Sequence, residues 1–336
     1  MNLIRPRVRV AVPGVLAVGC LLAVSLAVLD GQQGVVRPTA PVVPNAAPQV
    51  AALTNGTLPI VAEHRYRVAA KIRPLVLFWI GKDNVGGARL RWRRGENDER
   101  GYDLLIGSDP DRAPRRVNRW GFILEESRSG GATVLGVMKR SDEETLKEAT
   151  SRVASEANEG VVFKMIQATI DRSESVARVT ISKAGRDYSY RELDALLEVL
   201  LKETSPPKIR KTPVPPGGRS GLLTGIAELL HDAVESVHRA GKAPGKKSLA
   251  YAYYAKQYDV ARISSEIQRN ARYGGTTYAK LLKSDFEVRA RGESWTESFA
   301  IVCGLDGPLA EIPVFLTYQP RWWFKVEMTL DEREVF

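Results

Sequence analysis

The carboxy-terminal quarter of the chain repeats long strand-like stretches between short turn sequences, and this pattern limits the possible folds most. Gly274-Gly275, residues 304–307 and Gln319-Pro320 supply the turns. The stretches between them are rich in β-branched and aromatic residues, which are typical of strands. We therefore expect an antiparallel β-rich domain, either a sandwich or a partial barrel. Its five predicted strands are residues 249–262, 277–291, 295–302, 312–318 and 322–330.

The region before this domain mixes strand and helix patterns. Leu90 and Trp92 alternate with arginines at 89, 91 and 93, which indicates a half-buried strand with Trp92 in the core and the arginines in water. Two hairpins are predicted, each from two strand-like stretches joined by turn residues. The strand-like stretches are residues 66–80, 102–106, 120–125 with 133–138, and 161–170 with 176–181.

Capping boxes predict two helices in the same region. Ser141 is followed by Glu144, and Ser189 by Glu192, and each pair precedes apolar residues at helical spacing. The predicted fold class is therefore α+β and strand-dominated: a hydrophobic amino-terminal helix, a mixed β/α region, then the β-rich domain.

A proline-rich basic segment separates the two strand-rich regions and predicts a linker without regular structure. A helix over residues 222–239 follows it. Whether the two β-rich regions form one domain or two stays open. The proposed units are a leader (1–30), a Pro/Ala/Val-rich tether (31–62), an α+β domain (63–203), the linker (204–221), and a helix with the β-rich domain (222–336).

The leader contains an uncharged, mostly apolar run that begins at Val10 and ends at Leu29, after three arginines. Twenty residues at helical rise can cross a bilayer core of about 30 Å, and the arginines favour a cytoplasmic amino terminus. Three fates remain open: a retained signal anchor, a cleaved signal peptide, or a lipoprotein with Cys20 as its first residue. We expect the rest of the chain to be exported into the bacterial cell envelope, held by the cytoplasmic membrane or released into the periplasm.

Charge and cysteine content limit the partners and the chemistry. The net charge of +10 falls to +7 without the three leader arginines (10 − 3 = 7), which favours anionic surroundings. Outside the cytoplasm, these are an anionic envelope lipid or glycan; nucleic acid is not expected. Cys303 is the only cysteine beyond the leader, so no intrachain disulfide is possible there, and its apolar neighbours predict a buried inert thiol.

Two groups of residues are candidate sites. His231, Glu235 and His238 share one side of the predicted helix and could hold a metal ion, although their spacing fits tetrahedral zinc poorly. Arginines next to tryptophans can bind an anionic group while the ring stacks on a sugar or a lipid. The candidate ligand-binding residues of this kind are Arg119, Trp120, Arg321, Trp322 and Trp323.

No nucleophile, phosphate-loop or dinucleotide motif is recognisable, and no cofactor is implied. The preferred interpretation is an exported, membrane-tethered envelope protein whose ectodomain binds or scaffolds, with a protein partner also possible. The first alternative is an exported hydrolase that acts on an envelope polymer with carboxylates as acid and base. The second is a carrier of a small amphipathic ligand inside the carboxy-terminal β domain.

Overall fold

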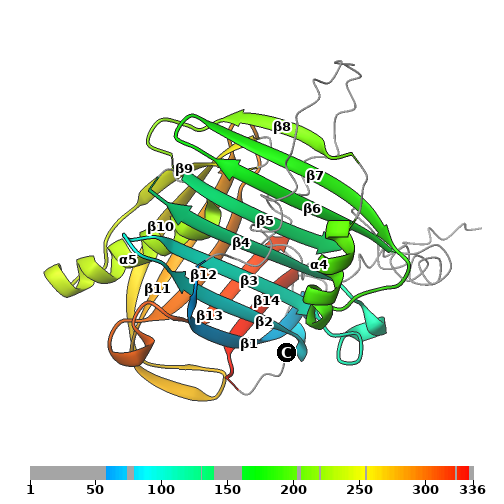
Figure 1. Ribbon diagram of the computed structural model, residues 1–336. Helices are drawn as coiled ribbons and strands as arrows, with labels where there is room; N and C mark the ends of the chain where they lie inside the picture. Colours follow the sequence, from blue (N-terminus) through cyan, green and yellow to red (C-terminus); the bar gives the residue numbers. More distant parts are fainter. Residues whose placement is uncertain are drawn as a thin grey trace, which may run out of the picture.

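Fourteen antiparallel strands form one sheet that curls into a nearly closed barrel (Figure 1). This computed structural model describes residues 58–73, 79–129, 131–139, 161–202, 206–218, 221–253, 256–321 and 324–332. The strands are β1 (Ile60–Ile72), β2 (Ile80–Arg94), β3 (Arg100–Ser108), β4 (Trp120–Arg128), β5 (Gly131–Lys139), β6 (Val161–Ile170), β7 (Glu174–Ala184), β8 (Lys208–Pro213), β9 (Lys247–Tyr253), β10 (Lys256–Tyr273), β11 (Thr276–Ala290), β12 (Glu297–Gly304), β13 (Pro313–Arg321) and β14 (Phe324–Leu330).

The sheet is a continuous meander whose two halves join through the first and last strands. Its order is β8-β7-β6-β5-β4-β3-β2-β1-β14-β13-β12-β11-β10-β9. β1 pairs with β14 from Tyr66 opposite Leu330 to Ile72 opposite Phe324. At the seam, the Gln257 side chain donates a hydrogen bond to the Pro213 carbonyl oxygen (2.9 Å). The strands before and after the predicted linker therefore belong to the same sheet.

Strand alternation separates an apolar interior from a charged exterior, as predicted for residues 89–93. Leu90 packs against the inner core, whereas Arg91 and Arg93 form ion pairs with Glu63 (2.6 Å) and Asp103 (3.0 Å). Successive strand residues point to opposite faces, so this register fixes the faces of residues 89–94 in β2.

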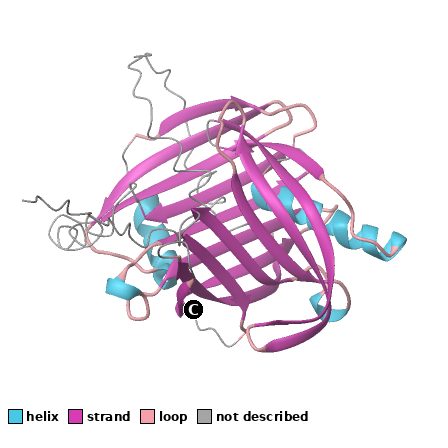
Figure 2. Cartoon of the chain, turned by 180° about the vertical axis from the view of Figure 1, so that it is seen from behind, coloured by secondary structure: helices cyan, strands magenta, loops and turns pink. Residues whose placement is uncertain are grey.

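Helix α5 (Leu222–Ala240) fills part of the barrel, and one of its ends extends beyond the sheet (Figure 2). The helix buries a stripe that includes Leu229, Ala233 and Val237 in the core. Its first N–H groups are capped from across the interior by Glu125 of β4, which accepts from Leu222 N (2.9 Å) and Thr224 N (3.0 Å). This capping satisfies donors that the start of any helix leaves without partners.

Glu125 and Gly221 approach each other so closely that the position before the helix requires glycine. A Cβ at position 221 would lie 2.3 Å from Glu125 Oε2. Burial raises the pKa of the fully buried Glu125 carboxyl, and the hydrogen bonds from the helix N–H groups offset only part of that effect.

Helix α4 (Leu193–Lys202) lies on the outside of the barrel, after the one-turn 3₁₀ helix η4 (Tyr190–Glu192). The predicted capping box is confirmed: Glu192 accepts a hydrogen bond from Ser189 N (3.0 Å). Leu196 and Leu200 pack on the outer faces of β3 to β7. We call this the outer cluster; its members include Leu105, Trp120, Phe122, Val137, Phe163, Tyr190, Leu193, Leu196, Leu197 and Leu200.

The strand-dominated class is confirmed, but three local predictions are wrong. Residues 249–262 form parts of two strands, β9 and β10, which make a hairpin. The proline-rich segment contains strand β8, which pairs with β7. The carboxy-terminal strands form no sheet of their own, because β14 pairs with β1 and so joins them to the strands of the amino-terminal half. The predicted helix at 146–157 lies outside the described residues.

The leader and most of the tether, residues 1–57, also lie outside the described residues. In the part of the chain that the structure describes, no helix is long and apolar enough to span a membrane.

Candidate functional site

A cavity of about 150 Å³ lies inside the barrel between α5 and strands β1–β3 and β12–β14. Most of its wall is apolar. The lining residues are Val61, Tyr66, Leu90, Trp92, Arg93, Arg94, Arg100, Tyr102, Leu104, Leu223, Ile226, Ala227, Leu230, His231, Phe299, Ile301, Glu311, Pro313, Leu316 and Met328.

The number of strands explains why space remains inside the barrel. An eight-stranded barrel is just filled by its own side chains, whereas barrels of about 16 strands leave a channel. Fourteen strands therefore enclose more volume than inward side chains fill, and α5 occupies part of it. The helix packs against β3, β4, β9 and β10, and the cavity lies between it and β1–β3 and β12–β14.

The cavity wall contains two packed aromatic rings, those of Trp92 and Tyr102, and the buried hydroxyl of Tyr66. Trp92 and Tyr102, on neighbouring strands, meet edge to face at 6.3 Å between centroids. Tyr66 is 1% exposed, and its hydroxyl has no hydrogen-bond partner among the described residues. Burial raises the pKa of Tyr66 well above its ordinary range, so the hydroxyl stays protonated and can donate. Buried hydroxyls usually bind a polar atom or water, so Tyr66 offers a hydrogen bond inside an otherwise apolar wall.

The mouth of the cavity combines apolar and charged residues. Val61 lines the cavity and is 59% exposed, so apolar surface continues to the solvent. Arg94 and Arg100 line the same side from β2 and β3. Opposite them, His231 Nδ1 of α5 lies 2.7 Å from Glu311 Oε1, near the start of β13.

A buried arginine holds α5 in place beside the cavity. Arg262 of β10 is 1% exposed and donates to the Leu229 carbonyl oxygen (2.6 Å) and to Asp232 Oδ2 (2.9 Å), both on α5. Burial alone would raise the pKa of the Asp232 carboxyl, but the hydrogen bonds from Lys247 and Arg262 outweigh it and lower the pKa. The helix is thus fixed at its first turn by Glu125 and at its centre by Arg262.

The three candidate metal ligands do not converge, because each has a different partner. His231 contacts Glu311, and Glu235 forms an ion pair with Arg239 (3.7 Å). His238 Nε2 lies 3.0 Å from the Leu305 carbonyl oxygen and 3.1 Å from Asp306 Oδ1. No group of three or more acidic, histidine or cysteine side chains that could hold a metal occurs in the described ranges.

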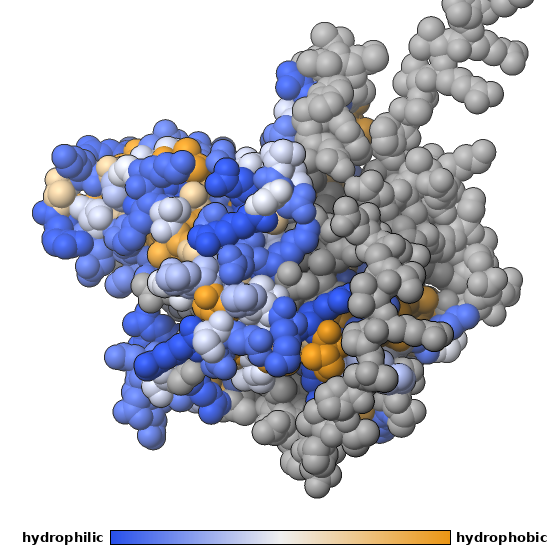
Figure 3. Space-filling view, turned by 90° about the horizontal axis from the view of Figure 1, so that it is seen from above, coloured by the Kyte–Doolittle hydropathy of each residue, from blue (hydrophilic) through white to orange (hydrophobic). Residues whose placement is uncertain are grey.

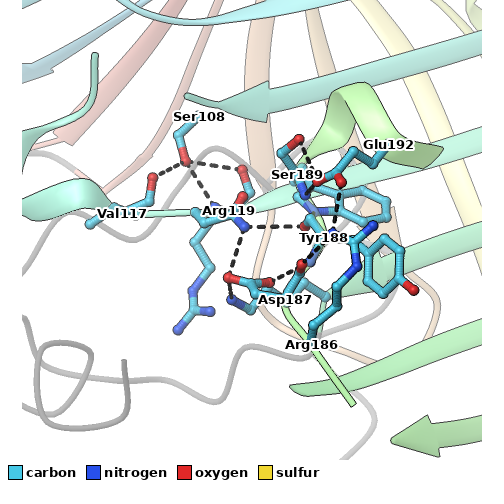
Figure 4. A network of polar contacts seen from close by, with 11 residues as sticks. Ser108, Val117, Arg119, Arg186, Asp187, Tyr188, Ser189 and Glu192 are labelled. Carbon is cyan, nitrogen blue, oxygen red and sulfur yellow. Dashed lines mark hydrogen bonds and ion pairs between the residues drawn. The ribbon is translucent and has the colours of Figure 1, made fainter. Parts of the chain in front are cut away.

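Arg119 and Trp120 belong to a packed network outside the barrel (Figure 4). Trp120 is 1% exposed in the outer cluster, and its Nε1 donates to the Tyr188 carbonyl oxygen (2.7 Å). Arg119 is 6% exposed, and its backbone N–H donates to Ser108 Oγ (2.8 Å). Trp120 helps to fix the segment before α4, and its buried ring has no face open to a ligand.

The other residues singled out in the sequence are the candidate ligand-binding residues 321–323 and the cysteine at position 303. Trp322 and Trp323 lie outside the described residues, as does the side chain of Arg321. The prediction for Cys303 is confirmed: it is buried in the inner core, and burial raises its thiol pKa to about 12, so it is a packing residue.

The surface seen from above is mostly hydrophilic where it is described, with apolar groups in separate patches (Figure 3).

The sequence arguments missed the cavity, because its wall comes from six strands and a helix that are far apart in the chain. One signal was present. Trp92 and Tyr102 flank a turn with an arginine on each side of it, at positions 94 and 100.

The comparisons with known proteins give a fold resemblance only. No protein-family model matches the chain, and no curated protein has a matching sequence. Among solved structures, the chain is similar to a β-barrel-like protein with a domain of unknown function, DUF1849, from Brucella abortus. The sequence identity is 9%, the TM-score is 0.40, and the match covers 82% of this chain and 98% of that one. This resemblance indicates nothing about a ligand or a reaction.

Proposed function

We propose that this chain is a binding protein whose barrel takes the apolar part of a small amphipathic molecule into the cavity beside α5. One observation carries the proposal: an apolar cavity, continuous with exposed Val61 at its mouth, lies inside a barrel that α5 fills only in part. This is the carrier alternative, except that the cavity is lined by strands from both halves of the chain.

The size of the cavity limits the ligand. Sites for drug-sized molecules are about 300–1,000 Å³, so a cavity of about 150 Å³ accommodates one short apolar group. A part of an acyl chain or a small ring is of suitable size. The rest of an amphipathic ligand would remain at the mouth, near the charged residues.

The chemistry of the cavity favours binding over hydrolysis. Glu311 is the single carboxylate among the residues that line it. A hydrolase that uses two carboxylates needs a pair of them across the substrate, and the lining offers no such pair. A purely scaffolding protein requires no interior cavity at all.

Export and tethering remain part of the proposal. The apolar run and the tether would place the barrel outside the cytoplasmic membrane, where amphipathic lipids and their breakdown products are present. The supporting observations are the length of the run, its flanking arginines and the proline-rich composition of the tether.

Fluorescence titration with N-phenyl-1-naphthylamine, a neutral apolar probe, tests the proposal. We expect the probe to bind with increased emission, and Ala227→Trp to abolish binding because the new ring would fill the cavity from α5. Ala279→Trp, on the exposed side of β11, adds the same ring away from the cavity and is the matched control.

Probe binding that survives in Ala227→Trp, with a folded barrel by circular dichroism, would show that the cavity is not the site. Equal loss in both tryptophan variants would indicate a non-specific effect and would also reject the proposal.

A further inference from the structure

Two arginines face each other at the mouth of the cavity. Arg94 near the end of β2 and Arg100 at the start of β3 are register partners across the hairpin. Both are exposed and both line the cavity. Side chains directly opposite in an antiparallel pair lie about 5 Å apart at Cβ, and like charges there repel each other.

The neighbouring arginines have acidic partners, and these two do not. Arg91 pairs with Glu63 and Arg93 with Asp103, on the outer face of the same strands. Among the described residues, no carboxylate lies within ion-pair distance of Arg94 or Arg100. The charge of Arg100 offsets part of the rise that burial causes in the pKa of Tyr102, which is part of the cavity wall. The repulsion between the two guanidinium groups is therefore not balanced by an acidic side chain.

We infer that the ligand is an anionic amphiphile, whose carboxylate or phosphate head binds between Arg94 and Arg100 while its apolar tail enters the cavity. The inference rests on the proposed function and adds the charge of the ligand to it. A guanidinium group donates two parallel hydrogen bonds to such a head, so one anionic group can bind between both arginines and reduce their mutual repulsion. The two arginines therefore match an anionic head, and the apolar wall beside them matches the tail of the same molecule.

Glu311 is the acidic residue on the other side of the mouth, and its position is compatible with an anionic head. Its carboxylate lies 2.7 Å from His231 Nδ1, so it is already engaged by α5. Arg94 and Arg100, the basic residues of the lining without an acidic partner, come from β2 and β3, whereas Glu311 directly precedes β13. An anionic head is directed to the β2–β3 side.

The test compares ligands that share a tail and differ in the head. Octanoate, octyl phosphate and octan-1-ol are titrated against the bound naphthylamine probe in the full chain. Both anions should bind with a dissociation constant about tenfold lower than that of octanol, as expected for charge-assisted hydrogen bonds. They should therefore displace the probe at about one tenth of the concentration. In Arg94→Gln/Arg100→Gln this advantage should disappear, while octanol should bind as before.

Arg269→Gln/Arg272→Gln is the matched control, because it removes two exposed arginines of β10 and the same net charge. It should retain the tenfold advantage. Tighter binding of octyl phosphate than of octanoate would assign a phosphate head, and the reverse order a carboxylate head.

Equal displacement by octanol and both anions in the unmodified chain would overturn the anionic head while leaving the cavity as a binding site. The head-group site would also be wrong if the two double variants lost the advantage equally. If neither the probe nor any octyl compound bound, the proposed function itself would fail.

Discussion

The outer cluster under α4 and the inner core around α5 are built from the same sheet, and the inner one borders the cavity described above. Leu196 of α4 is fully buried against the outer faces of β3 to β7. Leu230 of α5 is also buried, but it lines the cavity. A helix that lies on a sheet can bury its apolar stripe completely, because only one of its sides must be covered.

A helix inside a wide barrel has walls on every side and reaches only some of them. α5 packs against β3, β4, β9 and β10, and space remains towards β1, β2 and β12–β14. The comparison indicates that the cavity follows from fourteen strands around one helix, which one face of α5 cannot fill. Four predictions test this difference.

The largest effect should come from shortening a leucine of the outer cluster, and the same substitution in the inner core should cost about half as much. Leu196→Ala should lower the free energy of unfolding by about 4 kcal/mol, because every atom removed is in packed contact. Leu230→Ala should lower it by about 2 kcal/mol, because part of that side chain already borders the cavity. Chemical denaturation measures both. Equal losses would show that the inner wall is packed as densely as the outer cluster.

Removing the cap of α5 should be nearly as costly. Glu125→Ala leaves the N–H groups of Leu222 and Thr224 buried without an acceptor, so we expect a loss of about 3 kcal/mol. Glu287→Ala, an exposed position on β11, is the control and should change little. If both substitutions had the same small effect, the helix would not depend on Glu125 for its position.

The central anchor of α5 should make stability depend on pH. The pKa of Asp232 is lowered from its ordinary value of 3.8, so the folded state favours the carboxylate. Its contribution is present above about pH 4 and is lost as the pH falls through the lower folded pKa. Asp232→Asn should cost about 2 kcal/mol at pH 7.

This cost should shrink on acidification, which denaturation curves between pH 7 and pH 3 will measure. A constant difference between the two proteins at all these pH values would argue against an ionised Asp232 as the partner of Arg262.

The smallest effects should have opposite signs in the two regions. Tyr66→Phe removes a buried hydroxyl without a described partner and should stabilise the protein by about 1 kcal/mol. Tyr190→Phe, in the outer cluster, loses the hydrogen bond from Arg112 Nη2 (3.2 Å) and should destabilise it by about 1 kcal/mol. Thermal unfolding of both variants is sufficient. Destabilisation by Tyr66→Phe would mean that the hydroxyl is already satisfied, for example by bound water.

Local patterns in the sequence predicted local structure well and the assembly poorly. The capping box at Ser189 and Glu192, the hairpin of β4 and β5, and the alternation around Trp92 depend on residues near each other in the chain. The pairing of β1 with β14 joins residues more than 250 positions apart, and no local signal encodes it. Residues 249–262 read as one strand because the hairpin turn between β9 and β10 contains neither glycine nor proline.

The candidate site shows the same division. Trp120 was chosen for its basic neighbours, but its burial depends on α4, about 75 residues later in the chain. Trp92 was predicted as a core residue, and it does face inward; that the wall there borders a cavity depends on β13, β14 and α5. Arg94 and Arg100 became candidates only when the register placed them opposite each other.

Tryptophan quenching by a brominated amphiphile tests the central claim most directly, because Trp92 lines the cavity and Trp120 lies in the outer cluster. Bromine quenches indole emission on contact, so 8-bromooctanoate in the cavity should quench Trp92 and leave Trp120 unaffected. The account predicts that the quenchable part of the emission disappears in Trp92→Phe and persists unchanged in Trp120→Phe. Undiminished quenching in Trp92→Phe would show that the amphiphile binds elsewhere and would contradict the account.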